Sequence, residues 1–134
     1  MSNQIPLKFC LLAASFHALN ALFPAISIFS ILIIWIIWLC TKAIHPFIDL
    51  SGRNALNCAI NDLLTTTVGI ALCLLVFSLT CGVGNQDPFL LMASLMLVCL
   101  LMLAYAIYAV VAGIFALRGH NFTSRLIYPF IQAE

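Results

Sequence analysis

The sequence predicts an all-helical membrane protein, a bundle of four transmembrane helices whose first two helices are short and whose termini both lie on the cytoplasmic side. Composition is the first reason: 65% of the 134 residues are hydrophobic and 7% are charged, whereas roughly 25% of a soluble domain is charged. The second reason is that long uncharged stretches alternate with short breaks of proline, glycine and polar residues. The third is that the basic residues fall on one side of the resulting crossings.

The first two helices share one uncharged stretch, Phe9–Thr41, which exceeds the roughly 20 residues that one crossing needs. Phe23-Pro24 lies near its middle, and proline removes a backbone donor and disfavours helix at the residue before it. We therefore predict two short helices, over about residues 5–23 and 25–41.

The third helix is expected over about residues 54–79, after a polar link at about residues 42–53 that lies in the membrane interface. Ser51 or Asp49 is available in the link as an N-cap for this helix. The link is the longest polar-rich interruption of the chain, so its residue pattern is the best guide to identity.

The fourth helix is expected over about residues 88–118, after a turn that begins at Cys81. Asp87 can cap this helix, because Pro88 follows at the first helical position, where its missing N–H is harmless. Gly119 can supply the left-handed residue that ends it.

The distribution of charge tests this count of crossings. With four crossings, all basic residues fall on one face, which the positive-inside rule makes cytoplasmic: Lys8, Lys42, Arg53, Arg118 and Arg125. The opposite face holds only Asp87, whereas a single crossing over Phe9–Thr41 would separate Lys8 from the rest. The first residues show no cleavable signal pattern, so we expect residues 1–134 to insert uncleaved as a single transmembrane domain.

Composition also excludes several functions. The net charge of +1 provides no basic field for nucleic acid. The six cysteines are isolated, without a C-x-x-C pair, which predicts buried thiols and no metal site or cofactor: Cys10, Cys40, Cys58, Cys73, Cys81 and Cys99. No nucleophile stands beside a base in a known catalytic pattern, so we expect no enzyme activity, with lipid chemistry as a remote alternative.

Polar residues recur at helical spacing along the third predicted helix. They form an intramembrane stripe of Asn54, Asn57, Asn61, Thr65 and Gly69, with Asp62 beside it. Such a stripe cannot face lipid, and its simplest role is hydrogen bonding between helices, with His17 and Asn20 of the first helix as partners. For Asp62 the simplest interpretation is an ordinary interfacial or paired carboxylate, and the alternative is that it lines a conducting path or carries protons.

The fourth predicted helix carries small residues at four-residue spacing, which lets helix backbones approach closely. They are Ala109 with Gly113 and Ala112 with Ala116. A packing seam is the role that this spacing favours.

One motif in the link resembles a known family. Pro46-Phe47-Ile48-Asp49 and Gly52-Arg53-Asn54-Ala55-Leu56-Asn57, with Trp35, Trp38 and Lys42 before them and Tyr128-Pro129-Phe130-Ile131 after the last helix, form the pattern. It resembles small bacterial membrane proteins related to the twenty-kilodalton subunit of the protein translocon of the chloroplast inner envelope. That resemblance implies a four-helix membrane protein and, by way of the plastid relatives, a part in protein transport.

The motif also has a purely architectural interpretation as an interfacial hinge. Pro46 would redirect the chain, Phe47 would dip into the interface, and Gly52 would permit the turn. Asp49 would pair with Arg53 or cap the next helix. A binding site is the alternative.

Two functions follow as hypotheses. The first is a small packing or assembly subunit of a larger membrane complex, with the bilayer and other membrane proteins, or further copies of the chain, as partners. The second is a component of a protein- or ion-conducting pathway lined by the third helix. The expected location is a bacterial cytoplasmic membrane or a thylakoid or plastid-type membrane.

Overall fold

The structure is a computed structural model that describes residues 5–22, 27–82, 88–122 and 129–131. Within these ranges all regular structure is helical: α1 (Leu7–Leu22), α2 (Ser27–Thr41), α3 (Pro46–Gly82) and α4 (Pro88–Leu117). The prediction of four helices with a short first pair is confirmed. The expected turn at Pro24, cap at Asp87 and positive charge at Arg125 lie outside the described residues.

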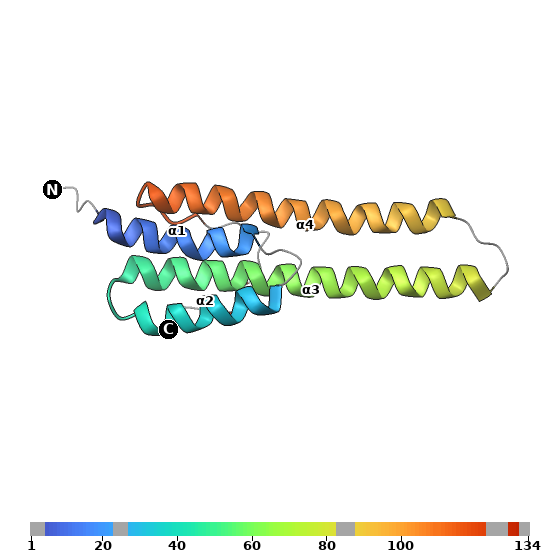
Figure 1. The fold of residues 1–134 in the computed structure, drawn as a ribbon, viewed down its shortest axis with the longest axis horizontal. Coiled ribbons are helices and arrows are strands. Elements are labelled where there is room, and N and C mark those ends of the chain that lie inside the picture. The colour runs from blue at the N-terminus through green and yellow to red at the C-terminus, as the bar shows by residue number, and fades with distance from the viewer. Residues whose placement is uncertain (1–4, 23–26, 83–87, 123–128, 132–134) are drawn as a thin grey trace.

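The helices divide the molecule into two halves (Figure 1). α3 and α4 lie side by side as one long hairpin, and α1 and α2 cover only the part of it that contains the start of α3 and the end of α4. We call α1, α2 and residues 46–62 and 105–117 the four-helix half. Residues 63–82 and 88–104 form the hairpin half, which has no cover from α1 or α2.

Helix lengths follow from these bounds. At 1.5 Å per residue, α3 is about 55 Å long and α4 about 45 Å, whereas α1 and α2 are about 24 and 22 Å. The hydrocarbon core of a bilayer is about 30 Å thick. Two helices are therefore long and apolar enough to cross a membrane, over Pro46–Leu79 and Pro88–Leu117.

The third helix begins eight residues earlier than expected, at Pro46 instead of about residue 54. The cause is His45, whose ring Nδ1 accepts the Phe47 N–H at 3.1 Å and whose carbonyl accepts the Ile48 N–H at 3.0 Å. Pro46 then occupies the first helical position, where no donor is needed. Most of the predicted interfacial link is consequently helical.

The other helix ends agree more closely with local sequence signals. Gly119 has a φ of 76°, and its N–H bonds to the Ala116 carbonyl while that of His120 bonds to the Phe115 carbonyl, each at 3.0 Å. This pair of bonds is a Schellman motif, so the left-handed stop at Gly119 is confirmed. At the start of α1, the Pro6 carbonyl accepts the Phe9 N–H at 2.9 Å.

The apolar core lies in the four-helix half. Phe16 of α1, Ile34 of α2 and Ile48 of α3 are each fully buried and pack together with Leu56 and Trp38. The hairpin half instead exposes its large side chains, for example 63% of Leu74 and 64% of Met96. Outward apolar side chains of this kind are what a bilayer accepts and water does not.

Small residues let α1 approach α4. Ala109, Ala112 and Ala116 are each 1% exposed, and a Cβ atom added at Gly113 would lie 3.5 Å from the Cβ atom of His17. The four residues of the predicted packing seam thus lie on the α4 side that is buried, three of them completely.

Candidate functional site: the polar groups of the four-helix half

A polar corner joins α2 to α3 at one end of the molecule. Trp38 of α2 is 7% exposed, and its indole ring lies directly against Gly52 of α3. A Cβ atom at position 52 would overlap with this ring, so only glycine leaves the space. We call Trp38, Lys42, Asp49, Gly52 and Arg53 the α2–α3 corner.

The single carboxylate of the corner is bonded on both oxygens. Trp38 Nε1 donates to Asp49 Oδ1 at 3.0 Å, while Arg53 donates from Nε and Nη2 to Oδ2, each at 3.0 Å. Two cations also lie over the indole ring, Lys42 Nζ at 5.1 Å and Arg53 Cζ at 5.6 Å from its centroid. The indole is thereby held by its N–H, its faces and its glycine contact.

The structure differs from the predicted hinge at Gly52 and Phe47 and agrees with it for the Asp49–Arg53 ion pair. Gly52 lies inside a helix and makes room for a side chain, so it does not permit a turn. Phe47 is buried against Ala13 and Ala116, so it does not dip into the interface. Asp49 and Arg53 do form the expected ion pair, one helical turn apart.

Further polar groups connect α1 to α3 inside the bundle. Asn20 Nδ2 donates to the carbonyl of Ala55 at 2.7 Å, and His17 Nε2 lies 3.3 Å from Ser51 Oγ. His17 and Ser51 are 2% and 0% exposed. These side chains hydrogen-bond between helices, as expected for His17 and Asn20 from the sequence. Their role is to hold α1 against α3.

Asn57 makes the longest-range polar contact that the structure describes. Its Oδ1 accepts the Ile131 N–H at 2.8 Å, and its Nδ2 donates to the Ile131 carbonyl at 3.2 Å. One side-chain amide thus pairs with both backbone groups of a residue 74 positions away, as a neighbouring strand would. Ile131 also packs against the core of the four-helix half.

The rest of the predicted stripe bonds within or between helices. Asn61 Nδ2 donates to the Asn57 carbonyl at 2.7 Å in its own helix, and Thr65 Oγ1 lies 3.1 Å from the hydroxyl of Tyr105 on α4. Asp62 is 6% exposed, and Asn54 is half-buried. Of these residues Asn57 and Asp62 are buried, and Asn54, Asn61, Thr65 and Gly69 are half-buried.

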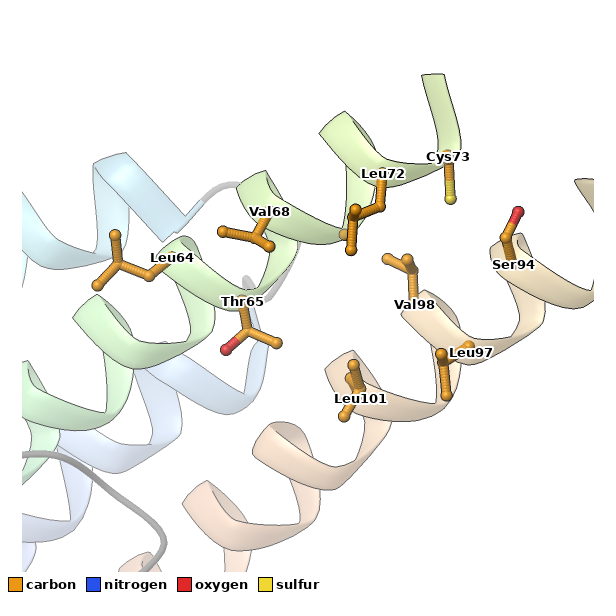
Figure 2. Close-up of a pocket in the computed structure, with 10 residues that line it drawn as sticks. Leu64, Thr65, Val68, Leu72, Cys73, Ser94, Leu97, Val98 and Leu101 are labelled. Atoms are coloured by element: carbon orange, nitrogen blue, oxygen red, sulfur yellow. The ribbon is translucent and has the colours of Figure 1, made fainter. Parts of the chain in front are cut away.

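An apolar groove, which Thr65 and Gly69 of the stripe help to line, runs between α3 and α4 in the hairpin half (Figure 2). Its volume is ≈ 370 Å³, and leucine and valine side chains dominate its walls. Its two hydroxyl groups are engaged, Thr65 with Tyr105 and Ser94 Oγ with the Leu91 carbonyl at 2.8 Å. The groove therefore suits hydrocarbon and offers little to an ion.

Metal-binding side chains are dispersed in the described part of the chain. No group of three or more His, Cys, Asp or Glu residues lies close enough there to hold a metal ion. The described cysteines are free, with Cys40 and Cys99 exposed and Cys10, Cys58 and Cys73 buried.

The relationship of this chain to known proteins comes from a family comparison. The model of the magnetosome magnetite crystal formation protein family matches residues 9–131. The chain belongs to this family. The match covers α2, α3 and α4 and all but the first two residues of α1. No curated protein and no solved structure matches the chain.

This membership corrects the resemblance drawn from the link motif. The chain matches a magnetosome family and not a translocon family, so the translocon assignment is wrong. The protein-transport role and the plastid-type membrane rested on that resemblance and have no support. The membrane character of this magnetosome-family chain remains consistent with α3 and α4, which are long and apolar enough to span a bilayer.

Sequence reasoning missed three structural residues of the site. His45 was not recognised as the cap of α3, although a polar residue directly before proline is a known start signal. Trp38 appears in the sequence only as part of the motif pattern, and its contact with Gly52 has no local signal. Ile131 was noted only as part of the tail pattern, because nothing in the sequence links it to Asn57.

We expect Gly52→Ala to lower the free energy of unfolding by about 1–3 kcal/mol, because the new methyl group overlaps with the Trp38 ring. Gly113→Ala is the matched control, since its Cβ atom meets only ordinary contacts and alanine favours helix by up to ~1 kcal/mol. Thermal unfolding in mild detergent, followed by circular dichroism, measures both. Equal stability of the two variants would contradict the contact.

The Asn57 contact predicts a change in hydrogen exchange. Asn57→Ala removes the acceptor of the Ile131 N–H, so this amide should exchange about fivefold faster, from ~1 kcal/mol for one hydrogen bond. Asn61→Ala is the control, because the side chain of Asn61 bonds within its own helix. Exchange followed by NMR in detergent micelles gives both rates, and an unchanged Ile131 rate in Asn57→Ala would refute the contact.

Proposed function

We propose that this chain is a multi-pass subunit of the magnetosome membrane that acts in magnetite crystal formation by packing with other membrane proteins, without catalysing a reaction. The observation that carries the proposal is the family match over residues 9–131. Magnetite formation is the function that the family description gives, and the packing role is our inference from the fold.

Two features of the fold support a packing role. Polar side chains hydrogen-bond between helices, Asn20 of α1 with Ala55 of α3 and Thr65 of α3 with Tyr105 of α4. The hairpin half exposes apolar side chains along two adjacent helices, including Leu72 at 56% and Leu100 at 56%. Such a surface can receive lipid or the helices of neighbouring proteins.

A conducting pathway is the second candidate. The observation in its favour is Asp62, a carboxylate that is 6% exposed in the middle of a candidate membrane span. The hydrogen bonds of Asn57 and Thr65 weigh against it, because these bonds hold the stripe to other parts of the same chain. The apolar groove of the hairpin half offers few ligands for an ion.

For the topology, we propose that all four helices enter the bilayer and that both termini lie on the cytoplasmic side. The basic side chains of Lys8, Lys42, Arg53 and Arg118 support this arrangement, because they gather where α1 and α3 begin and α2 and α4 end (Figure 1). α1 and α2, about 24 and 22 Å long, are the short helices of the bundle.

Loss of the chain should alter magnetite crystals. In a magnetite-forming host, deletion of the gene should change the size or number of crystals seen by electron microscopy, and the wild-type gene should restore them. Asp62→Asn should also restore them if packing is the role, since the amide keeps the shape of the carboxylate.

Failure of Asp62→Asn, with normal amounts of protein in the membrane, would favour the conducting pathway instead. Crystals that are unchanged by the deletion would refute both roles. Purification from magnetosome membranes in mild detergent should recover the chain with defined partners, and recovery only as a monomer would contradict the packing role.

The topology predicts one-sided labelling at Cys81. We expect a variant in which the other five cysteines are serine to react with an impermeant maleimide only from the face opposite the termini, because Cys81 stands near the end of α3. A cysteine placed at Ser2 is the control for the cytoplasmic face. Labelling of Cys81 and Ser2→Cys from the same side would refute the topology.

A further inference from the structure

The charges of the α2–α3 corner do not cancel. Asp49 is bonded on both oxygens, one to Trp38 Nε1 and the other to Arg53, so the charge of Arg53 is compensated. Lys42 is exposed and lies over the indole ring, a contact that leaves the ammonium charge in place. The corner therefore carries one net positive charge, the Lys42 ammonium, which lies over the Trp38 ring.

Exposed apolar side chains form a stripe on α2 next to this charge. Trp35 and Leu39 stand seven and three positions before Lys42, a spacing that places the three side chains on one face of the helix. Trp35 is 47% and Leu39 is 44% exposed. A cation at the end of an exposed apolar stripe matches a molecule with an anionic head and a hydrocarbon tail.

The position of the corner agrees with a membrane surface. The first turn of α1, the end of α2 and the end of α4 lie at the same end of the molecule (Figure 1), and Lys8 and Arg118 stand there. Anionic lipids attract such basic side chains by about 1 kcal/mol each. A soluble anion would gain the charge contact but nothing from Trp35 and Leu39.

We propose that the α2–α3 corner binds an anionic phospholipid, with its phosphate at Lys42 and an acyl chain along Leu39 and Trp35. The structure keeps Trp38 beneath the head group through Gly52 and Asp49, and Arg53 positions Asp49. This site rests on the membrane insertion in the proposed function and adds a lipid preference to it.

Fluorescence quenching tests the site. In a Trp35→Phe background, Trp38 is the single tryptophan, and dibrominated lipids quench it when they bind beside it. The protein is reconstituted in phosphatidylcholine vesicles with equal small fractions of dibrominated phosphatidylglycerol or dibrominated phosphatidylcholine. We expect the phosphatidylglycerol to bind about fivefold more strongly at low salt, from ~1 kcal/mol for one lysine, and this preference to fall at high salt.

Two substitutions separate a site from a general surface charge. Lys42→Gln should abolish the preference, because it removes the ammonium and keeps most of the side chain. Lys8→Gln should leave it unchanged, although the Lys8 ammonium also lies over an aromatic ring, that of Phe9, at 5.1 Å. Far-UV circular dichroism verifies that both variants are folded.

Three results would overturn the proposal. Equal quenching by the two brominated lipids would leave the membrane role intact and remove the site. An equal effect of Lys8→Gln and Lys42→Gln would assign the preference to the overall charge of this end. Absence of quenching by either lipid would refute membrane placement of α2 and the site with it.

Discussion

The contact between Trp38 and Gly52 is the interaction on which the four-helix half depends. Burying an indole in a helix interface needs space for the ring and a partner for its N–H, and α3 supplies both through Gly52 and Asp49. This contact fixes α2 against α3 close to their connection. Ile34, about one turn of helix before Trp38, is then held in the core with Phe16.

Local rules predicted most of the helices. Proline and glycine act on their own neighbourhood, so Pro88 and Gly119 marked the ends of α4 correctly. The start of α3 was placed too late because Asp49 and Ser51 looked like caps, whereas the ring of His45 caps the helix earlier. The charged residues of the link favour an interfacial segment by composition, whereas the one-turn spacing of Asp49 and Arg53 suits a helix.

The sequence predicts which face of α3 carries the polar side chains, but it does not predict the groups to which they hydrogen-bond. Periodicity alone places Asn57, Asn61 and Thr65 on an inward face, because polar groups avoid lipid. Which groups they meet depends on how distant segments pack, and Ile131, 74 residues from Asn57, shows why spacing could not reveal it. The same holds for Trp38, whose contact with Gly52 exists only once α2 turns back along α3.

The link motif was a poor guide to the family because each of its residues has a structural purpose in this fold. Asp49 and Arg53 neutralise each other, Gly52 makes room for a ring, and Pro46 starts a helix. A pattern explained by helix packing carries information about architecture and little about activity. The magnetosome family match rests on residues 9–131 and thus on far more of the chain than the motif does.

Polar side chains need hydrogen-bond partners inside a membrane, and the two halves of the molecule supply these partners in different ways. In the four-helix half, Asn20 Nδ2 donates to the Ala55 carbonyl and Ser51 Oγ lies beside His17 Nε2, so contacts between helices supply the partners of these atoms. In the hairpin half, Thr67 and Ser78 bond back to carbonyls of their own helix, at 2.8 Å each, and no second layer of helices is needed to satisfy them. The hydroxyls of Thr67 and Ser78 are therefore paired although that half exposes mostly apolar side chains. A helical hairpin of this kind can pack against lipid or against another helix.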